Sequence, residues 1–187
     1  MPSHDRFFVL TGGPGSGKTT LVEALKARGY ATTEEAGRGV IREEMQGGGN
    51  ALPWLDRERF AELMFDWELR SYRSAERQHG PVVFDRGLPD TIGYLRVEGL
   101  EVPAWMEEKA WRLRYNARVF IAPPWKEIFG TDEERRQSWA VAVRTCEIMV
   151  EAYAALGYEL MELPRTSVDR RADFVVDAMG MNVPGRA

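Results

Sequence analysis

The chain has 187 residues, of which 44% are apolar and 29% are charged, and its net charge is −4 at pH 7. That length and composition are typical of one globular domain with a full hydrophobic core. The negative charge gives no support for nucleic acid or an anionic membrane as a main partner. The first residues do not have the pattern of a signal peptide and no apolar stretch is long enough to span a bilayer, so we expect a cytoplasmic protein.

Strand-like and helix-like segments alternate along the chain. Apolar strand patterns lie at 7–11, 30–33, 81–84, 117–122 and 158–163. Helical patterns lie at 18–27, 37–45, 56–78, 89–97, 103–116, 131–157 and, capped by Ser167, at 167–179. Strands joined by helical crossovers predict an α/β fold in which helices cover both faces of a five-stranded parallel sheet. We expect a single three-layer domain over residues 1–187, with its ligand site beyond the carboxyl ends of the strands.

The first strand pattern runs directly into the glycine-rich sequence GGPGSGKTT at 12–20, which contains the phosphate-loop motif G-x-x-x-x-G-K-T. Backbone N–H groups in such a loop point at one centre, and the helix that follows adds its positive end. Lys18 is expected to reach the β- and γ-phosphates of a nucleotide, and the Thr19 hydroxyl to ligate Mg²⁺. The residues expected to hold ATP are Gly13, Pro14, Gly15, Ser16, Gly17, Lys18, Thr19 and Thr20.

An acid and an arginine follow the third strand pattern, in the sequence Asp85-Arg86-Gly87. A carboxylate at this place faces the phosphate loop, where it can hold Mg²⁺ through water or accept a proton from a substrate. Arg86 can bind an acceptor phosphate or carboxylate with two parallel hydrogen bonds. The alternative is that Asp85 is only a turn residue before Gly87.

The second strand pattern also ends in acids and an arginine, in the sequence from Thr33 to Arg38. Phosphoryl transfer needs a base beside the attacking hydroxyl and a cation beside the transferred charge. Glu35 and Arg38 are our candidates for these roles. Glu34 is the second choice for the base, because neighbouring residues of an extended segment point in opposite directions. The alternative is a solvated helix start whose acids complement the helix dipole.

A segment at about 124–138 that carries cations and acids follows the fourth strand pattern and resembles a lid. Arg135 and Arg136 are candidates for closing over the phosphates and neutralising transition-state charge. They fall in the first turn of the helix that we expect a capping box, Thr131 and Glu134, to open, where the helix dipole disfavours cations. The alternative is a solvated surface on which these arginines pair with neighbouring acids.

The whole chain resembles the P-loop nucleoside and nucleotide kinases and, more closely, the small AAA-domain family of predicted ATPases that includes the ribosylnicotinamide kinase domain. The segments that carry this resemblance are GGPGSGKTT, TTEEAGR, VVFDRG, TDEERR and LPRTSVDRRADFV. The resemblance implies the sheet order 2-3-1-4-5 and an acceptor-side helical region at about 37–79. TTEEAGR is similar to the Thr-Arg-Glu-Pro motif of thymidylate kinases and places Glu35 on their glutamate, with Glu34 and Ala36 replacing the arginine and proline.

Two functions are compatible with these residues. The first is an ATP- and Mg²⁺-dependent phosphotransferase, in which Lys18, Thr19 and Asp85 handle ATP while Glu35, Arg38 and Arg86 face a small-molecule acceptor. Arg135 and Arg136 complete its catalytic candidates. The second is a regulatory ATPase whose product is a conformational change. The identity of the acceptor, the preference for ATP or GTP and the oligomeric state are left open by the sequence.

Overall fold

The computed structural model describes residues 3–129 and 138–180, which fold around a five-stranded sheet. The strands are β1 (Phe7–Gly12), β2 (Ala31–Thr32), β3 (Val82–Asp85), β4 (Arg118–Ala122) and β5 (Glu159–Glu162). They lie in the order β2-β3-β1-β4-β5, and all four neighbouring pairs are parallel. The expected fold class and sheet order are therefore confirmed.

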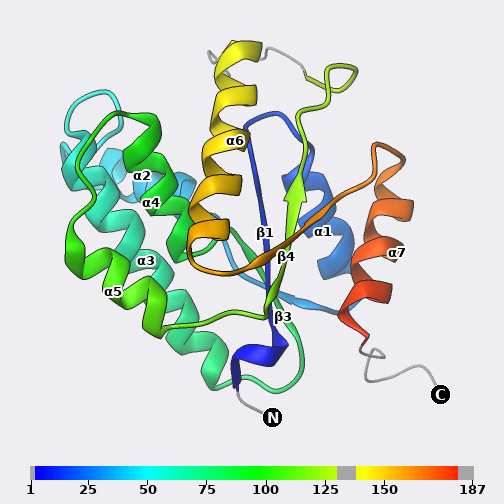
Figure 1. Ribbon diagram of the computed structural model, residues 1–187. Helices are drawn as coiled ribbons and strands as arrows, with labels where there is room; N and C mark the ends of the chain where they lie inside the picture. The colour runs from blue at the N-terminus through cyan, green and yellow to red at the C-terminus, as the bar shows by residue number, and fades with distance from the viewer. Residues whose placement is uncertain (1–2, 130–137, 181–187) are drawn as a thin grey trace.

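Helices cover both faces of the sheet (Figure 1). A short 3₁₀ turn, η1 (Ser3–Arg6), precedes β1, and the helices are α1 (Lys18–Ala27), α2 (Ala36–Gly47), α3 (Arg57–Glu76), α4 (Leu88–Val97), α5 (Ala104–Arg112), α6 (Trp139–Ala155) and α7 (Val168–Met179). Helices α1 and α7 pack together on one face, whereas α2 to α6 cover the other. These are the three layers that the alternating sequence pattern predicts.

The central strand β1 is buried on both faces, which explains its continuous apolar run. Successive side chains of a strand point to opposite faces. Phe7 and Val9 therefore join the core beneath α2–α6, while Phe8 and Leu10 join the core beneath α1 and α7. This packing fixes β1, and with it the position of the loop that leaves its carboxyl end.

Several expected boundaries differ from the structure. Strand β2 is shorter than the pattern at 30–33, and α5 ends at Arg112 because the chain then extends to pair Asn116 N with Phe7 O. Ser167 precedes α7 as expected, but its side chain makes no capping hydrogen bond.

The expected start of α6 is wrong. Ser138 is extended and caps the helix, with its side chain accepting a hydrogen bond from Val141 N, so the helix begins at Trp139. The predicted capping box, together with Arg135 and Arg136, lies outside the described residues.

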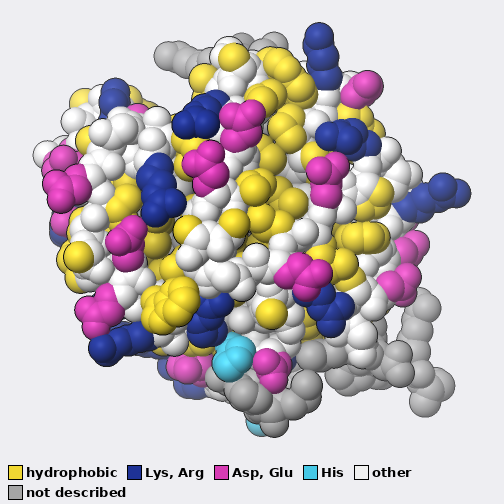
Figure 2. All heavy atoms as spheres, in the orientation of Figure 1, with side chains coloured by type: hydrophobic (Ala, Val, Ile, Leu, Met, Phe, Trp, Pro, Cys, Tyr) yellow, Lys and Arg dark blue, Asp and Glu magenta, His cyan; other side chains and the backbone are white. Residues whose placement is uncertain are grey.

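The surface carries charges of both signs. On the face shown in Figure 2, basic and acidic side chains alternate with apolar ones, and neither sign forms a continuous patch. Within residues 3–129 and 138–180, no helix combines the length and the apolar character that a membrane crossing requires.

Candidate active site

The phosphate loop, residues 12–20, connects β1 to α1 in the way that the motif requires. Gly17 stands at the N-cap of α1 with a left-handed φ of 77°, and a Cβ at this position would lie 2.7 Å from Arg171 Nη1. Gly13 lies so close to α6 that a Cβ would meet Ala142 O at 2.4 Å. Only glycine satisfies the backbone conformation at the first position and the close approach at the second. The conformation of the loop therefore depends on glycine at these positions and on the close approach of α6 and α7.

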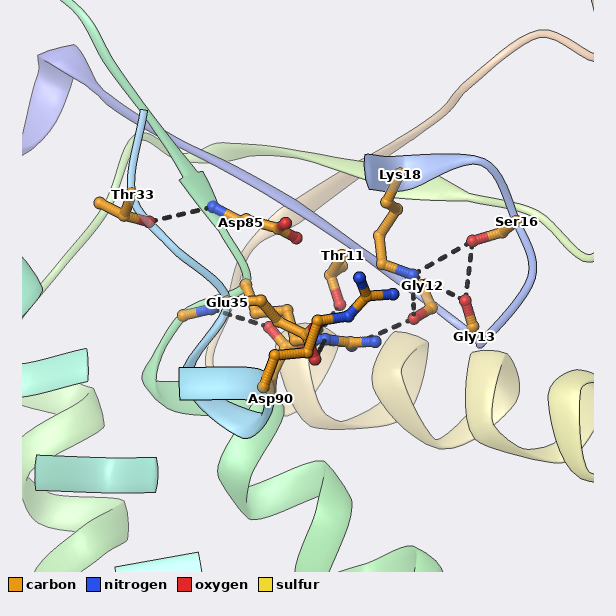
Figure 3. A network of polar contacts seen from close by, with 12 residues as sticks. Thr11, Gly12, Gly13, Ser16, Lys18, Thr33, Glu35, Asp85 and Asp90 are labelled. Atoms are coloured by element: carbon orange, nitrogen blue, oxygen red, sulfur yellow. Dashed lines mark hydrogen bonds and ion pairs between the residues drawn. The ribbon is translucent and has the colours of Figure 1, made fainter. Parts of the chain in front are cut away.

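Lys18 folds back over this loop, as Figure 3 shows. Its Nζ donates hydrogen bonds to Gly12 O at 3.0 Å, Gly13 O at 2.7 Å and Ser16 Oγ at 3.2 Å. Burial, followed by the nearby Arg86 guanidinium, lowers the pKa of Lys18 to about 7. A polyanion that enters the loop would stabilise the charged form of the Lys18 amine and so raise its pKa. The attraction between the lysine and a nucleotide would therefore increase when the nucleotide binds.

Asp85 ends β3 next to the phosphate loop. Thr33 Oγ1 accepts a hydrogen bond from Asp85 N at 3.1 Å and so connects the ends of β2 and β3. The Asp85 side chain is only 8% exposed, and burial raises its pKa to about 6 against the opposing effect of Arg86. A buried carboxylate of this kind is stabilised by any cation that a ligand brings into the site.

Arg86 joins three parts of the site. Its Nε contacts Glu35 Oε1 at 3.3 Å, and its Nη1 donates to Gly12 O at 3.1 Å and Asp90 Oδ1 at 3.0 Å. Burial alone would lower the pKa of Arg86, but the three carboxylates of Glu35, Asp90 and Asp85 raise it. Its backbone φ is 75°, which is uncommon for a residue other than glycine and is typical of strained functional positions.

Asp90 on α4 accepts four hydrogen bonds and holds Arg86 in place. Besides Arg86 Nη1, Thr11 Oγ1 donates to Oδ1 at 2.5 Å, and Tyr153 Oη and Gly87 N donate to Oδ2 at 2.6 and 3.0 Å. The carboxylate is 5% exposed and is therefore a buried charge with all its partners supplied by the protein. It locks the start of α4 to β1 and α6.

Glu35 and Glu34 point to different sides, as the extended geometry predicts. Glu35 Oε2 pairs with Arg38 Nε at 3.2 Å while Oε1 contacts Arg86. Glu34 instead pairs with Arg42, away from the phosphate loop. This arrangement favours Glu35 over Glu34 as a base for an acceptor on the loop side.

These residues line one continuous cavity of about 340 Å³. The end of the cavity at the phosphate loop is formed by Pro14 to Thr20, while Gly13 lies behind the loop. Its middle contains Glu35, Arg38, Asp85, Arg86 and Asp90, which we call the acid–arginine cluster. Its far end is mostly apolar and includes Ile41, Phe60, Met64, Tyr94 and Val97. The volume is in the range of about 300 to 1,000 Å³ that small-molecule sites occupy.

Sequence reasoning missed two acids of this cavity. Asp90 lies four residues after Arg86, one helical turn away, and this spacing could have indicated a partner for the arginine. Glu68 lies four residues after Met64 and eight after Phe60, so it occupies a core position of the apolar face of α3. A charged residue in an apolar stripe was the signal that could have revealed it.

The donor set suits a cation that arrives with a nucleotide. In the described part of the chain no group of three or more His, Cys, Asp or Glu side chains could hold a metal ion by itself. Thr19 is exposed and lines the cavity, and Asp85 lines the same space. Mg²⁺ prefers a few protein oxygens completed by water and phosphate oxygens, so these two side chains fit it.

Comparison with known proteins gives the same architecture. A family model described as an AAA domain matches residues 7–171. The search of curated proteins found no match.

Several solved structures share the fold over nearly the whole chain. Deoxyadenosine kinase from M. mycoides, with dCMP and dCDP bound, has a TM-score of 0.65 and 13% identity over 93% of this chain and 98% of the kinase. Thymidylate kinase from Ehrlichia chaffeensis has a TM-score of 0.61 and 16% identity over 95% and 99%. The NadR protein in complex with NR has a TM-score of 0.66 and 18% identity over 98% of this chain, which spans only 52% of NadR.

Proposed function

We propose that this chain, which belongs to the AAA-domain family and has the fold of P-loop kinases, is an ATP- and Mg²⁺-dependent phosphotransferase that acts on a small molecule. The observation that carries the proposal is the single cavity that joins the phosphate loop to the acid–arginine cluster and continues into an apolar end. A regulatory ATPase needs room for water beside the γ-phosphate, whereas this space has the size and lining of an acceptor site.

On this proposal each residue has a defined task. The loop from Gly13 to Thr20 binds the phosphates through backbone N–H groups, and Lys18 contacts the β- and γ-phosphates. Thr19 and Asp85 would hold Mg²⁺, which would supply positive charge to neutralise the phosphates. Arg135 and Arg136 lie outside the described residues, and we propose for them the role that the sequence predicts, which is to close over the phosphates and neutralise transition-state charge.

The acceptor hydroxyl would lie beside Glu35 and Arg86. Its oxygen forms a bond to the γ-phosphorus while the bond from that phosphorus to the ADP oxygen breaks, and its proton passes to Glu35 or Asp85. Arg86 and Arg38 orient the acceptor and balance the charge. Arg86 is well suited to this because Asp90 and Glu35 fix its guanidinium from two sides.

The test is a screen of acceptors for ADP release above the rate with water alone. Nucleosides and nucleotides come first because deoxyadenosine and thymidylate kinases share the fold, and shikimate follows because a shikimate kinase does too. At least one acceptor is expected to stimulate ADP release and to appear as a phosphorylated product, with ATP and GTP compared as donors. If ATP binds tightly and no acceptor stimulates turnover, the regulatory ATPase becomes the better explanation.

A further inference from the structure

Glu68 is a buried acid that the proposed phosphoryl transfer does not use. It lies on α3 and is 1% exposed, and its Oε2 has no hydrogen-bond partner among the described residues. Leaving a buried polar atom unpaired is unfavourable, so such an atom calls for an explanation. Because Glu68 lines the cavity, a bound molecule can supply the partner.

A second polar group that lines the same cavity also lacks a partner. The Tyr94 hydroxyl on α4 is buried without a hydrogen bond in the described part of the chain, and Tyr94 lines the cavity as well. Two unpaired polar groups, from two helices, therefore face one space. Helix α3 supplies one of these groups and α4 the other, and the two helices are in contact.

Apolar and aromatic side chains line the cavity together with these two groups. Phe60 and Met64 precede Glu68 by two turns and one turn of α3, and all three line the cavity. The Phe60 and Tyr94 rings pack edge to face, with centroids 5.4 Å apart. Aromatic and thioether side chains pack well against a flat ring. We call this end of the cavity, formed by Phe60, Met64, Glu68, Tyr94 and Val97, the ring subsite.

The ion pairs of the other acids in the cavity indicate the protonation state in which Glu68 would contact a ligand. Glu35 and Asp90 in the same cavity contact Arg86, and Glu98 contacts Arg57 at 3.3 Å, whereas no described residue forms an ion pair with Glu68. A buried carboxylate that has no ion-pair partner is strongly disfavoured.

The acids that face Glu68 also favour its neutral form. Burial, and then the negative charges of Asp90 and Asp85, raise the pKa of Glu68 well above its ordinary value, with Glu35 adding to them and Arg86 opposing. The protein thus presents a neutral carboxyl group, which both donates and accepts a hydrogen bond.

We infer that Glu68 and Tyr94 bind the hydrogen-bonding edge of an uncharged heteroaromatic ring of the acceptor, such as the base of a nucleoside, while its hydroxyl group reaches the acid–arginine cluster. This inference rests on the proposed function and narrows its acceptor class. The ring packs between Phe60, Met64 and Tyr94, and the carboxyl group matches an adjacent donor and acceptor on the ring edge.

The experiment is a calorimetric titration of the full chain with adenosine, cytidine, guanosine and uridine. The probes for other chemistries are myo-inositol, an alcohol without a ring edge, and 1-methylpyridinium, a cationic ring. The variants are Glu68→Leu, Glu68→Gln and, as the matched control, Glu98→Gln, which alters a cavity acid that already has a cation partner. Affinity for ATP is measured for every variant.

We expect at least one nucleoside to bind the wild-type chain and to bind Glu68→Leu about tenfold to a hundredfold more weakly, since the ring edge loses both hydrogen bonds. Glu68→Gln retains a donor and an acceptor and should weaken binding less. Glu98→Gln should leave nucleoside affinity unchanged, and ATP affinity should stay the same in all variants.

Two measurements separate recognition from a structural role. Replacing an unpaired buried carboxyl group with leucine should raise the Tm of the ligand-free protein, whereas a structural Glu68 would make the same variant less stable. An infrared difference spectrum between the wild type and Glu68→Gln at neutral pH should contain a protonated carboxyl band that shifts when the nucleoside is added.

Equal nucleoside affinity of the wild type and Glu68→Leu would overturn the inference, as would tighter binding of 1-methylpyridinium or myo-inositol than of any nucleoside. If no nucleoside binds but another alcohol is phosphorylated, the inference fails while the kinase function stands. If nucleosides bind through Glu68 but nothing is phosphorylated, the ring subsite stands and the proposed function fails.

Discussion

The phosphate loop and the acid–arginine cluster line the same cavity, but they are built in different ways. The loop is one continuous run, residues 12–20, whose backbone forms the binding surface. The cluster is a set of side chains from the ends of β2 and β3 and from helices α2 and α4, held by Arg86 and Asp90. The first is defined by local conformation and the second by packing between distant segments.

This difference has a functional meaning. A triphosphate is the same ligand in every NTP site, so a backbone cradle with one lysine suffices. An acceptor varies, and side chains on separate elements can be exchanged without disturbing the loop. The comparison predicts that changes in the loop remove all activity, whereas changes in the cluster and beyond alter stability, rate or acceptor affinity separately.

The largest effect is expected for Lys18→Ala. Its Nζ would be the only side-chain cation within the phosphate loop, and its removal should reduce turnover by about a hundredfold to a thousandfold, as loss of a transition-state donor does. Lys26→Ala on the exposed side of the same helix is the control and should change nothing. Fluorescent ATP-analogue binding and ADP release measure both variants, and wild-type affinity and rate in Lys18→Ala would refute the loop assignment.

The next effect is on stability, at Asp90→Ala. The change leaves the Thr11 and Tyr153 hydroxyls and Gly87 N without their partner and removes one of the two carboxylates that contact Arg86. Breaking a buried pair of this kind should lower the free energy of unfolding by about 3 to 5 kcal/mol. Urea unfolding measures it as a lower midpoint with an unchanged slope.

The exposed Asp66 on α3 provides the control for that substitution. Asp66→Ala should change the free energy of unfolding by no more than about 0.5 kcal/mol. A similarly small change in Asp90→Ala would mean that the Arg86 network contributes little to the fold.

Lys18 and Asp90 also show how much of the structure can be predicted from the sequence. Lys18 was identified from its motif because the loop and its flanking elements are contiguous, and the sheet order followed from family resemblance. Asp85, Arg86, Glu35 and Arg38 were predicted because the carboxyl ends of parallel strands gather at one edge. Asp90 and Glu68 were not, because they lie on helices and enter the cavity only through the packing of α3 and α4.

The boundaries that were wrong have the same cause. Nothing local in the sequence ends α5 at Arg112; the chain leaves the helix because Tyr115 and Asn116 bond to Tyr158 and Phe7, which are distant in sequence. Likewise α6 begins after Ser138, whose side chain caps it, and the Trp139 and Phe129 rings pack together at this start with their centroids 5.3 Å apart.

A third prediction separates catalysis from stability at Asp85. Asp85→Asn removes a possible base and Mg²⁺ ligand and should lower turnover by about a hundredfold or more. The folded-state pKa of about 6 lies above the ordinary value of 3.8, so the free protein loses stability as pH rises from about 4 to 6, and the loss is complete above 6. Asp85→Asn should therefore raise the Tm at pH 8, by an amount that disappears as pH falls through 6 toward 4.

The measurement is thermal unfolding of wild type and Asp85→Asn across this pH range without nucleotide, beside ADP release at pH 8. Saturating Mg²⁺ and ATP should stabilise the wild type more than the variant, because bound cation favours the carboxylate. A lower Tm for Asp85→Asn at pH 8 would show that the ionised carboxylate stabilises the fold, contrary to its burial.

The smallest effect is expected at the rim of the cluster, for Arg38→Ala. The Arg38 side chain is 56% exposed and pairs with Glu35 at 3.2 Å, so its loss should change the free energy of unfolding by no more than about 1 kcal/mol. If Arg38 orients the acceptor, its KM should rise by about threefold to tenfold while the KM of ATP stays constant. Arg42→Ala, one turn later on α2, is the matched control, because Arg42 pairs with Glu34 outside the cavity. An equal rise in acceptor KM for both variants would show that net charge near the site, rather than the contact to Glu35, governs acceptor binding.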